Sequence, residues 1–186
     1  LLREKLLEKQ PEIYKINDEC SHLDRNRLES YVRYLSNRVI TELENGLHQI
    51  ADDMSRGNGF PYVTARVKPV DNILDKIKRF RNLKENKAYK GYRAKSRPWY
   101  SVADMPDIVG GRILVKRPTD LAEAQQRIED HFGVENIHEK DDFQYNPDKK
   151  THPYRMITYI VTVQGVPCEI QLLHLKAGIM CDIEHN

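Results

Sequence analysis

The sequence predicts an α+β domain in which a mixed β-sheet is flanked by helices. A long amphipathic helical pattern opens the chain, and strand and helix patterns then alternate. Two alternating apolar segments lie close together near the C-terminal end and predict a hairpin. With 186 residues the chain fits one domain, with a helical part over residues 1–58 and a core over residues 60–186.

The first predicted element is one long structural helix. Its apolar residues recur at steps of three and four and mark a single stripe: Leu28, Val32, Leu35, Val39, Leu43, Leu47, Ile50 and Met54. The two glycines within residues 56–59 predict its end, because glycine readily adopts the left-handed cap conformation.

The core elements follow in chain order. The first is a strand over 60–68, followed by a helix over 71–80 that begins at Pro69. An irregular loop over 81–100 then leads to a strand over 108–116. Thr119 is predicted to cap a helix that runs to about His131. A polar linker over 138–153 then leads to strands over 154–163 and 167–173, joined by a turn at Gln164 and Gly165.

Net charge, hydropathy and cysteine content limit the kinds of partner and location that we expect for this protein. The net charge is +2 with 31% charged residues, which indicates a polyanionic partner only weakly. No apolar run reaches the roughly 20 residues of a membrane helix, and no signal-peptide pattern opens the sequence, so we expect no membrane partner. The three cysteines, Cys20, Cys168 and Cys181, lack zinc spacing and are expected to be reduced thiols of a cytoplasmic protein.

Strand alternation places polar side chains of the hairpin on one face. Glu169 and Gln171 are predicted to point away from the core, as are Tyr154 and Thr158 of the preceding strand. An ordinary solvated sheet face fits the same pattern.

A second carboxylate precedes the strand over 108–116. Alternation puts Asp107 and Arg112 on opposite faces, and the Gly110–Gly111 pair is a candidate for a bulge that re-aims Arg112 or for close approach of a ligand. If Asp107 and Glu169 meet, they suit Mg²⁺, which prefers oxygen ligands and keeps waters and substrate phosphates in its shell.

Cationic residues cluster in the predicted strand over 60–68 and in the helix that follows it. Arg66 and Lys68 share one strand face, and Lys76 and Arg79 are neighbours on the next helix. Guanidinium and ammonium groups so placed suit a polyphosphate. A solvated basic helix face is the alternative.

Five segments resemble, in order and spacing, the motifs of RelA/SpoT-type alarmone synthetases. Residues 63–77 resemble R-x-K-x-x-x-S-I-x-x-K, residues 107–112 D-I-x-G-x-R, residues 154–159 Y-R-S-x-H-Y, residues 169–171 the start of E-I-Q-x-R-T, and residues 183–185 I-E-H. The resemblance covers about residues 60–186 and implies a nucleotidyltransferase-like sheet flanked by helices.

The resemblance also implies a reaction, in which the β,γ-diphosphate of ATP moves to the 3′-hydroxyl of an acceptor nucleotide, usually GDP or GTP. Roles carried over by position are catalysis by Glu169, Asp107 and Arg112, Mg²⁺ binding by Asp107 and Glu169, ATP binding by Arg66, Lys68, Lys76 and Arg79, and acceptor binding by Tyr154, Gln171 and Thr158. The basic loop over 84–100 supplies further candidate phosphate contacts at Lys87, Lys90, Arg93, Lys95 and Arg97.

Departures from the family pattern fall mainly on the acceptor half. Asn72 replaces serine in the first motif, Thr158 replaces histidine, Leu173 and His174 replace Arg-Thr, and Gly178 stands where many small synthetases carry a guanine-reading asparagine. The acceptor is therefore open between GDP or GTP, an adenosine nucleotide and the 3′ end of tRNA. The tRNA alternative is a growth-inhibiting toxin with an antitoxin or immunity protein as partner, acting in its own cytoplasm or, if delivered, in that of a target cell.

Two further expectations remain. A non-catalytic nucleotide-binding regulator is the alternative of another class, and a homo-oligomer is consistent with the resemblance. The family's H-D hydrolase motif is absent, and His138, Glu139, Asp141 and Asp142 are predicted to form a charged loop rather than a metal site.

Overall fold

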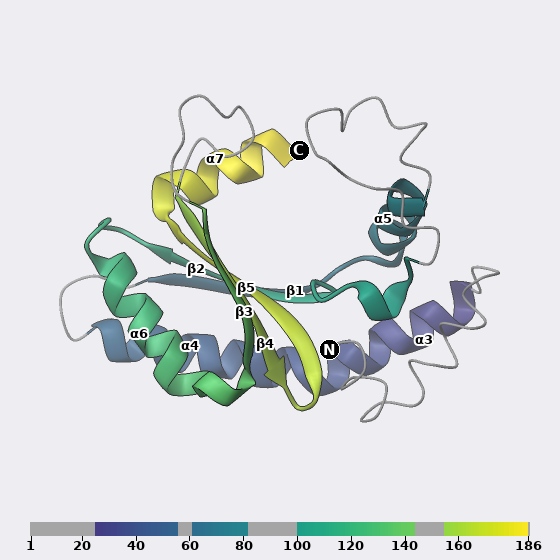
Figure 1. Cartoon of the computed structure of the whole chain (residues 1–186), viewed down its shortest axis with the longest axis horizontal. Helices are drawn as coiled ribbons and strands as arrows, with labels where there is room; N and C mark the ends of the chain where they lie inside the picture. The colour runs from purple at the N-terminus through teal and green to yellow at the C-terminus, as the bar shows by residue number, and fades with distance from the viewer. Residues whose placement is uncertain (1–24, 56–60, 82–99, 144–154, 186) are drawn as a thin grey trace.

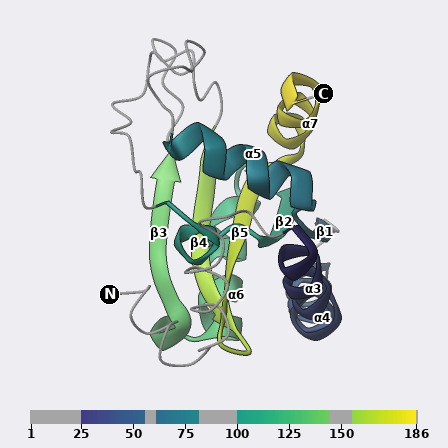
Figure 2. The same cartoon turned by 90° about the vertical axis from the view of Figure 1, so that its right-hand side faces the viewer.

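A five-stranded mixed sheet forms the centre of the computed structural model, which describes residues 25–55, 61–81, 100–143 and 155–185, with the backbone alone at 143 and 181–185. The strands are β1 (Tyr62–Val67), β2 (Val109–Val115), β3 (Ile137–Phe143), β4 (Met156–Val163) and β5 (Val166–His174). Their spatial order is β1-β2-β5-β4-β3, visible in Figure 2. Strands β2 and β5 run parallel and the other neighbours antiparallel, so the predicted α+β class with a mixed sheet is confirmed.

Helices cover both faces of this sheet (Figure 1). Below it in that view lie α3 (Arg25–Leu35), α4 (Thr41–Ser55) and α6 (Asp120–Phe132). Above it lie α5 (Val70–Arg81) and α7 (Leu175–His185), with the middle of the sheet between them. No helix in the described part of the chain is long and apolar enough to cross a membrane.

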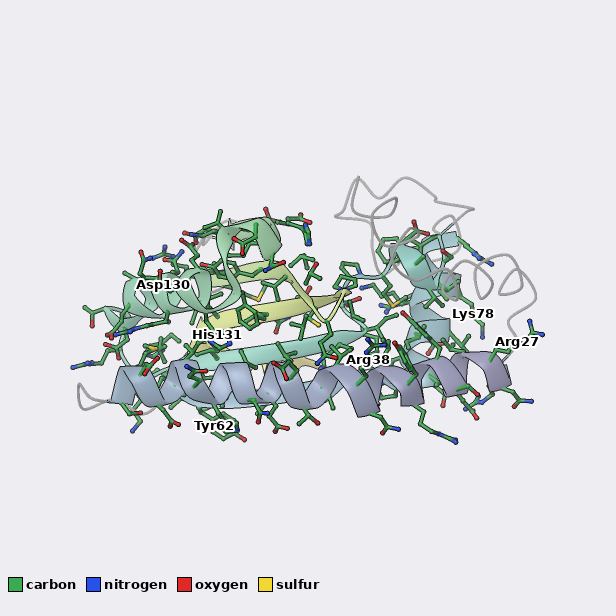
Figure 3. The ribbon with its side chains drawn as sticks, turned by 90° about the horizontal axis from the view of Figure 1, so that it is seen from below. Arg27, Arg38, Tyr62, Lys78, Asp130 and His131 are labelled. Atoms are coloured by element: carbon green, nitrogen blue, oxygen red, sulfur yellow. The ribbon has the colours of Figure 1, made fainter. Side chains whose placement is uncertain are left out.

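The predicted N-terminal helix is one continuous helical segment with a π turn at Ser36–Ile40 between α3 and α4. Leu35, Val39, Leu43 and Leu47 of the predicted stripe are fully buried. These residues are spaced by four, which exceeds the 3.6 residues of an α-helical turn, and the wider π turn takes up the difference. Arg38 within the π turn reaches the β4–β5 hairpin, where its Nε donates to Gln164 at 3.4 Å (Figure 3).

Alternation along β4 and β5 follows the prediction. Ile157, Tyr159 and Val161 of β4 pack into the main core with Cys168 and Ile170 of β5. The hairpin turn at Gln164 and Gly165 has positive φ at both positions, 49° and 81°, as a two-residue hairpin with the right-handed strand twist requires.

Two local predictions are wrong. The polar segment after α6 begins with the edge strand β3 rather than a linker, so His138, Glu139, Asp141 and Asp142 lie on a strand and not in a loop. Charged side chains on both faces hide the period of two, although they suit an edge strand because they discourage further pairing. The second error concerns Thr119, which stands at the N-cap of α6 as predicted but whose side chain accepts no cap hydrogen bond. The Asp120 carboxylate accepts a hydrogen bond from the backbone N of Arg117, which precedes the helix, at 3.3 Å.

Candidate active site

Strand register aligns side chains in rows across the face that α5 and α7 flank. The first row contains Arg66, Gly110, Glu169 and Ile160, the second Thr64, Arg112, Gln171 and Thr158, and the third Tyr62, Leu114, Leu173 and Met156. The third row is apolar, and Ala177 of α7 packs against its Leu114 and Leu173. The first two rows are therefore the part of this face open to a ligand between the two helices.

A pocket of about 240 Å³ opens over those two rows. Its lining comes from β1, β2, β5 and a residue two positions before β2: Thr64, Arg66, Asp107, Gly110, Gly111, Arg112, Glu169 and Gln171. Five of the ten predicted site residues thus lie at one pocket. Sequence reasoning did not single out Thr64, whose signal was its place two residues before Arg66 on the same strand face.

Asp107 meets two lysines at the edge of the pocket. Its Oδ2 accepts hydrogen bonds from Lys68, at the end of β1, and from Lys76 on α5, the latter at 2.6 Å. Its Oδ1 is buried and accepts no hydrogen bond from any residue that the structure describes. A half-satisfied buried carboxylate of this kind is costly unless a ligand completes it.

The charges around Asp107 oppose the effect of its burial. Burial alone raises the pKa of Asp107, but the nearby Lys76 and Lys68 ammonium groups lower it below its usual value. Burial lowers the pKa of Lys68, against the attraction of Asp107. Burial, reinforced by the negative charge of Asp107, raises the pKa of Glu169. The two carboxylates therefore lie near each other and differ in basicity, with Glu169 the better proton acceptor.

The two glycines of β2 face opposite sides of the sheet. No bulge interrupts the pairing of β2 with β1 or β5, so the suggested re-aiming of Arg112 does not occur. Asp107 shares the pocket with Arg112 because it precedes the strand, where alternation no longer applies. A Cβ at Gly110 would meet the Glu169 carbonyl at 3.4 Å, whereas one at Gly111 would lie 2.5 Å from Leu47 of α4. Gly110 leaves the pocket floor open, and Gly111 lets α4 approach the sheet.

A chain of hydrogen bonds joins Arg112 to Glu169. The Arg112 guanidinium donates to the Gln171 Oε1 through Nε at 3.3 Å and Nη2 at 3.1 Å. The Gln171 Nε2 donates to the Glu169 Oε1 at 2.8 Å. All three residues are half-buried, so these contacts are better protected from water than surface pairs.

The donor set fits a Mg²⁺ ion held by two carboxylates. Within the described residues, no group of three His, Cys, Asp or Glu side chains surrounds a metal position. Mg²⁺ does not require such a cage, because it binds one or two carboxylates and completes its shell with waters and phosphate oxygens. The buried, unsatisfied Asp107 Oδ1 is the observation that favours a cation here.

The remaining predicted site residues lie outside this pocket. Lys68 and Lys76 reach it through Asp107, while Arg79 is half-buried on α5 and does not line it. Thr158 is in the second row, but its hydroxyl is buried and makes no hydrogen bond within the described part of the chain. Tyr154 and the basic residues of the loop over 84–100 lie outside the described residues.

The two departures at positions 173 and 178 are packing residues. Leu173 is fully buried beneath α7. A Cβ at Gly178 would lie 2.5 Å from Leu114, so a larger side chain does not fit without a shift of α7 or Leu114. Neither position offers a polar group to a ligand on this face.

A mixed sheet with two carboxylates and several cationic side chains around one pocket offers groups that suit a phosphorylated ligand and a cation. The family model "Region found in RelA / SpoT proteins" matches residues 65–186, well over half of the sequence, and the chain belongs to this family. The GTP pyrophosphokinase YjbM of Bacillus subtilis (strain 168) is 29% identical over 148 residues, which are 75% of this chain and 60% of that protein.

Solved structures show the same fold. The small alarmone synthetase 2 of Bacillus subtilis superposes with a TM-score of 0.56 at 21% identity, over 79% of this chain and 73% of that one. The small alarmone synthetase 1 of the same organism superposes with a TM-score of 0.56 at 22% identity, over 84% of this chain and 78% of that one. A structure of the latter protein bound to AMPCPP superposes with a TM-score of 0.52 at 20% identity, over 84% of this chain and 76% of that one.

Proposed function

We propose that this chain is an ATP-dependent pyrophosphokinase that transfers the β,γ-diphosphate of ATP to the 3′-hydroxyl of an acceptor nucleotide. The observation that carries the proposal is that Asp107 and Glu169, from separate segments, line one pocket with Arg66 and Arg112, while Asp107 also binds the lysine pair. Membership of the RelA/SpoT family and the similarity to a GTP pyrophosphokinase and to an AMPCPP-bound synthetase support it.

The cationic side chains account for binding of the donor. Arg66 and Arg112 project from neighbouring strands into the pocket, and Lys68 and Lys76 lie at its Asp107 edge. Guanidinium groups take phosphate oxygens in pairs and lysines add compact positive charge. Alignment and charge neutralisation are the main requirements of phosphoryl-type transfer, and this set meets both.

Glu169 is the proposed proton acceptor. The acceptor's 3′-oxygen forms a bond to the β-phosphorus of ATP, the bond from that phosphorus to the α,β-bridging oxygen breaks, and AMP leaves. The hydroxyl proton passes to the Glu169 carboxylate, which burial makes more basic than an exposed glutamate. Asp107 and Glu169 would hold Mg²⁺, which when bound neutralises charge on the phosphates.

The acceptor is the open part of the proposal. GDP or GTP is the acceptor in the family resemblance, but Leu173 and Gly178 are buried and place no charge or base-reading group on the acceptor side. Loss of such groups weakens discrimination for the usual substrate. A tRNA 3′ end or an adenosine nucleotide is therefore tested beside the guanine nucleotides.

Labelled ATP identifies the acceptor directly. The protein is incubated with γ-labelled ATP and Mg²⁺ together with GDP, GTP, ADP or deacylated tRNA, and the labelled product is separated. Label in a mononucleotide supports the synthetase function and label in tRNA supports the toxin alternative. No label in any acceptor, with ATP bound, contradicts the pyrophosphokinase proposal and favours a nucleotide-binding regulator.

Glu169→Gln separates catalysis from binding. We expect this substitution to lower turnover by about 10²- to 10⁴-fold, the range for removal of a general base, with ATP binding largely kept. Product formation and nucleotide affinity are measured on the same preparation. Glu123→Gln, on the exposed surface of α6, is the matched control and should be unaffected. Full turnover by Glu169→Gln would exclude Glu169 as the base.

A further inference from the structure

The side-chain amide of Gln171 is engaged on both sides by other groups of the site. Its oxygen accepts two hydrogen bonds from Arg112, at 3.1 and 3.3 Å, and its nitrogen donates to Glu169 at 2.8 Å. The family resemblance places this residue among the acceptor contacts. The observed partners are instead one cation and one carboxylate of the same pocket.

Backbone register sets up this arrangement. The parallel pairing of β2 with β5 puts Arg112 directly beside Gln171, and Glu169 lies two residues before Gln171 on the same strand face. Gly110, the partner of Glu169 in the register, has no side chain with which to hold that carboxylate. Lateral support for Glu169 from this part of the sheet therefore comes through position 171.

The chemistry of the two neighbours fixes the orientation of the amide. A guanidinium offers donors and no acceptor, so the amide oxygen must face Arg112. An ionised carboxylate offers acceptors and no donor, so the amide nitrogen must face Glu169. Glutamate in this position would still pair with Arg112 but would place a second carboxylate against Glu169. A methionine would keep the length and lose both contacts.

We propose that Gln171 is a positioning residue that, held by Arg112, orients the Glu169 carboxylate, and that it does not contact the acceptor. This inference rests on the proposed function, because it assigns Glu169 its role in transfer. Groups that orient a reactive or metal-binding side chain commonly contribute 10- to 100-fold to activity or metal affinity. The hydrogen bond from Gln171 also counteracts the effect of burial on the pKa of Glu169.

The test uses Gln171→Met and Gln171→Glu in the full chain, with Gln126→Met on the exposed surface of α6 as the matched glutamine-to-methionine control. Thermal melting first establishes that each variant is folded. Steady-state kinetics then gives kcat and the KM of the acceptor that the wild type uses. Mn²⁺ affinity is measured separately by electron paramagnetic resonance in the presence of AMPCPP, whose α,β-methylene bridge prevents transfer.

We expect Gln171→Met to lower kcat by 10- to 100-fold with the acceptor KM changed less than about threefold, and to weaken Mn²⁺ binding by a similar factor. Gln171→Glu should lower kcat further, because of repulsion between its carboxylate and Glu169, and Gln126→Met should match the wild type. A raised acceptor KM with unchanged kcat overturns the proposal in favour of an acceptor contact. If the wild type transfers to no acceptor, the proposed function fails, and equal Mn²⁺ affinities of wild type and Gln171→Met then overturn the positioning role independently.

Discussion

Asp107 is the residue on which most charges of the site converge. Lys68 and Lys76 share one of its oxygens although they lie 39 and 31 positions away in sequence. Its other oxygen is buried without a hydrogen bond from the described residues, and its charge raises the pKa of Glu169. One carboxylate, just before β2, thus interacts with Lys76 of α5, with Lys68 after β1 and with Glu169 of β5.

The Asp107 carboxylate should make the fold sensitive to acid. Although burial alone raises its pKa, the charges of Lys76 and Lys68 lower that pKa below the usual value. A group with a lowered folded-state pKa contributes stability that is present above its unfolded-state pKa, about 3.9, and is lost as pH falls through the folded-state pKa. The wild-type free energy of unfolding should therefore fall below about pH 4.

Asp107→Asn tests this origin of the acid sensitivity. Urea unfolding at pH 7, 4 and 3 should show a smaller loss of stability with falling pH for Asp107→Asn than for the wild type. Asp75→Asn, at an exposed position of α5, should keep the wild-type slope. Identical slopes for wild type and Asp107→Asn would mean that the lysine pair does not stabilise the ionised carboxylate.

Cys168 should be chemically inert in the folded protein. It is fully buried on the core face of β5, and burial raises the pKa of its thiol to about 12. The thiolate is the nucleophile, so a neutral, buried thiol reacts slowly. We expect iodoacetamide at pH 8 to leave the peptide containing Cys168 unlabelled in the native protein and to label it in urea, as measured by mass spectrometry. Rapid native labelling of that peptide would contradict its burial.

At the scale of elements, substitutions at the two glycines of β2 should have different effects, one on the stability of the fold and the other on nucleotide binding. We expect Gly111→Ala to lower the free energy of unfolding by about 1–3 kcal/mol, because its Cβ would lie 2.5 Å from the buried Leu47 side chain and α4 must move. Gly110→Ala meets one carbonyl at 3.4 Å and should change stability by less than about 1 kcal/mol. Its methyl group enters the pocket, so nucleotide affinity should fall. Urea unfolding and nucleotide titration of the same two variants check both statements, and equal stability losses would refute the assignment of faces.

The elements with one clear apolar period could be predicted from sequence. Strands β4 and β5, their turn and the stripe of the long N-terminal helix all follow, because one face of each is buried and the other is not. Strand β3 could not, since His138, Glu139, Lys140 and Asp141 give no alternation at an edge of the sheet. Thr119 stands at the N-cap as predicted, but the residue type alone did not reveal that its side chain makes no cap hydrogen bond.

The residues of the candidate site could be predicted from the sequence, but the contacts among them could not. The ordered motifs grouped Arg66, Arg112 and Glu169 into one predicted site, the structure places all three at one pocket, and their roles remain predictions. The contacts of Asp107 with two lysines join segments far apart in the chain, and no local pattern encodes such pairings. The burial of Leu173 depends on α7 packing over its face of β5, which strand alternation does not reveal.

At the scale of the whole molecule, the two faces of the sheet have different tasks. The face toward α3, α4 and α6 carries most of the continuous apolar core. On the opposite face the third row packs against α7, and the first two rows carry the pocket. Because α5 holds Lys76 and the sheet holds Glu169, we expect a ligand in the pocket to contact both layers, and its binding should be coupled to the position of α5.

Metal and nucleotide should therefore bind with positive coupling. In the free protein Lys68 and Lys76 neutralise Asp107, which disfavours a bare cation at that carboxylate. Nucleotide phosphates compete for the two ammonium groups and release the carboxylate, so each ligand should raise the affinity of the other. By linkage the factor is the same in both directions, and about 5- to 150-fold is typical of such coupling.

Mn²⁺ titrations with and without AMPCPP measure this factor, and AMPCPP titrations with and without metal must return the same value. The metal affinity of AMPCPP itself, measured without protein, is subtracted in both cases. Asp107→Asn should remove most of the coupling, whereas Asp130→Asn, at an exposed position of α6, should retain it. Lys76→Gln is the discriminating variant: it should bind AMPCPP more weakly and Mn²⁺ alone more tightly than the wild type, because one of the two cations competing for Asp107 is gone. If Lys76→Gln weakens both ligands, then Lys76 serves only to attract phosphate and the contact with Asp107 does not restrain metal binding.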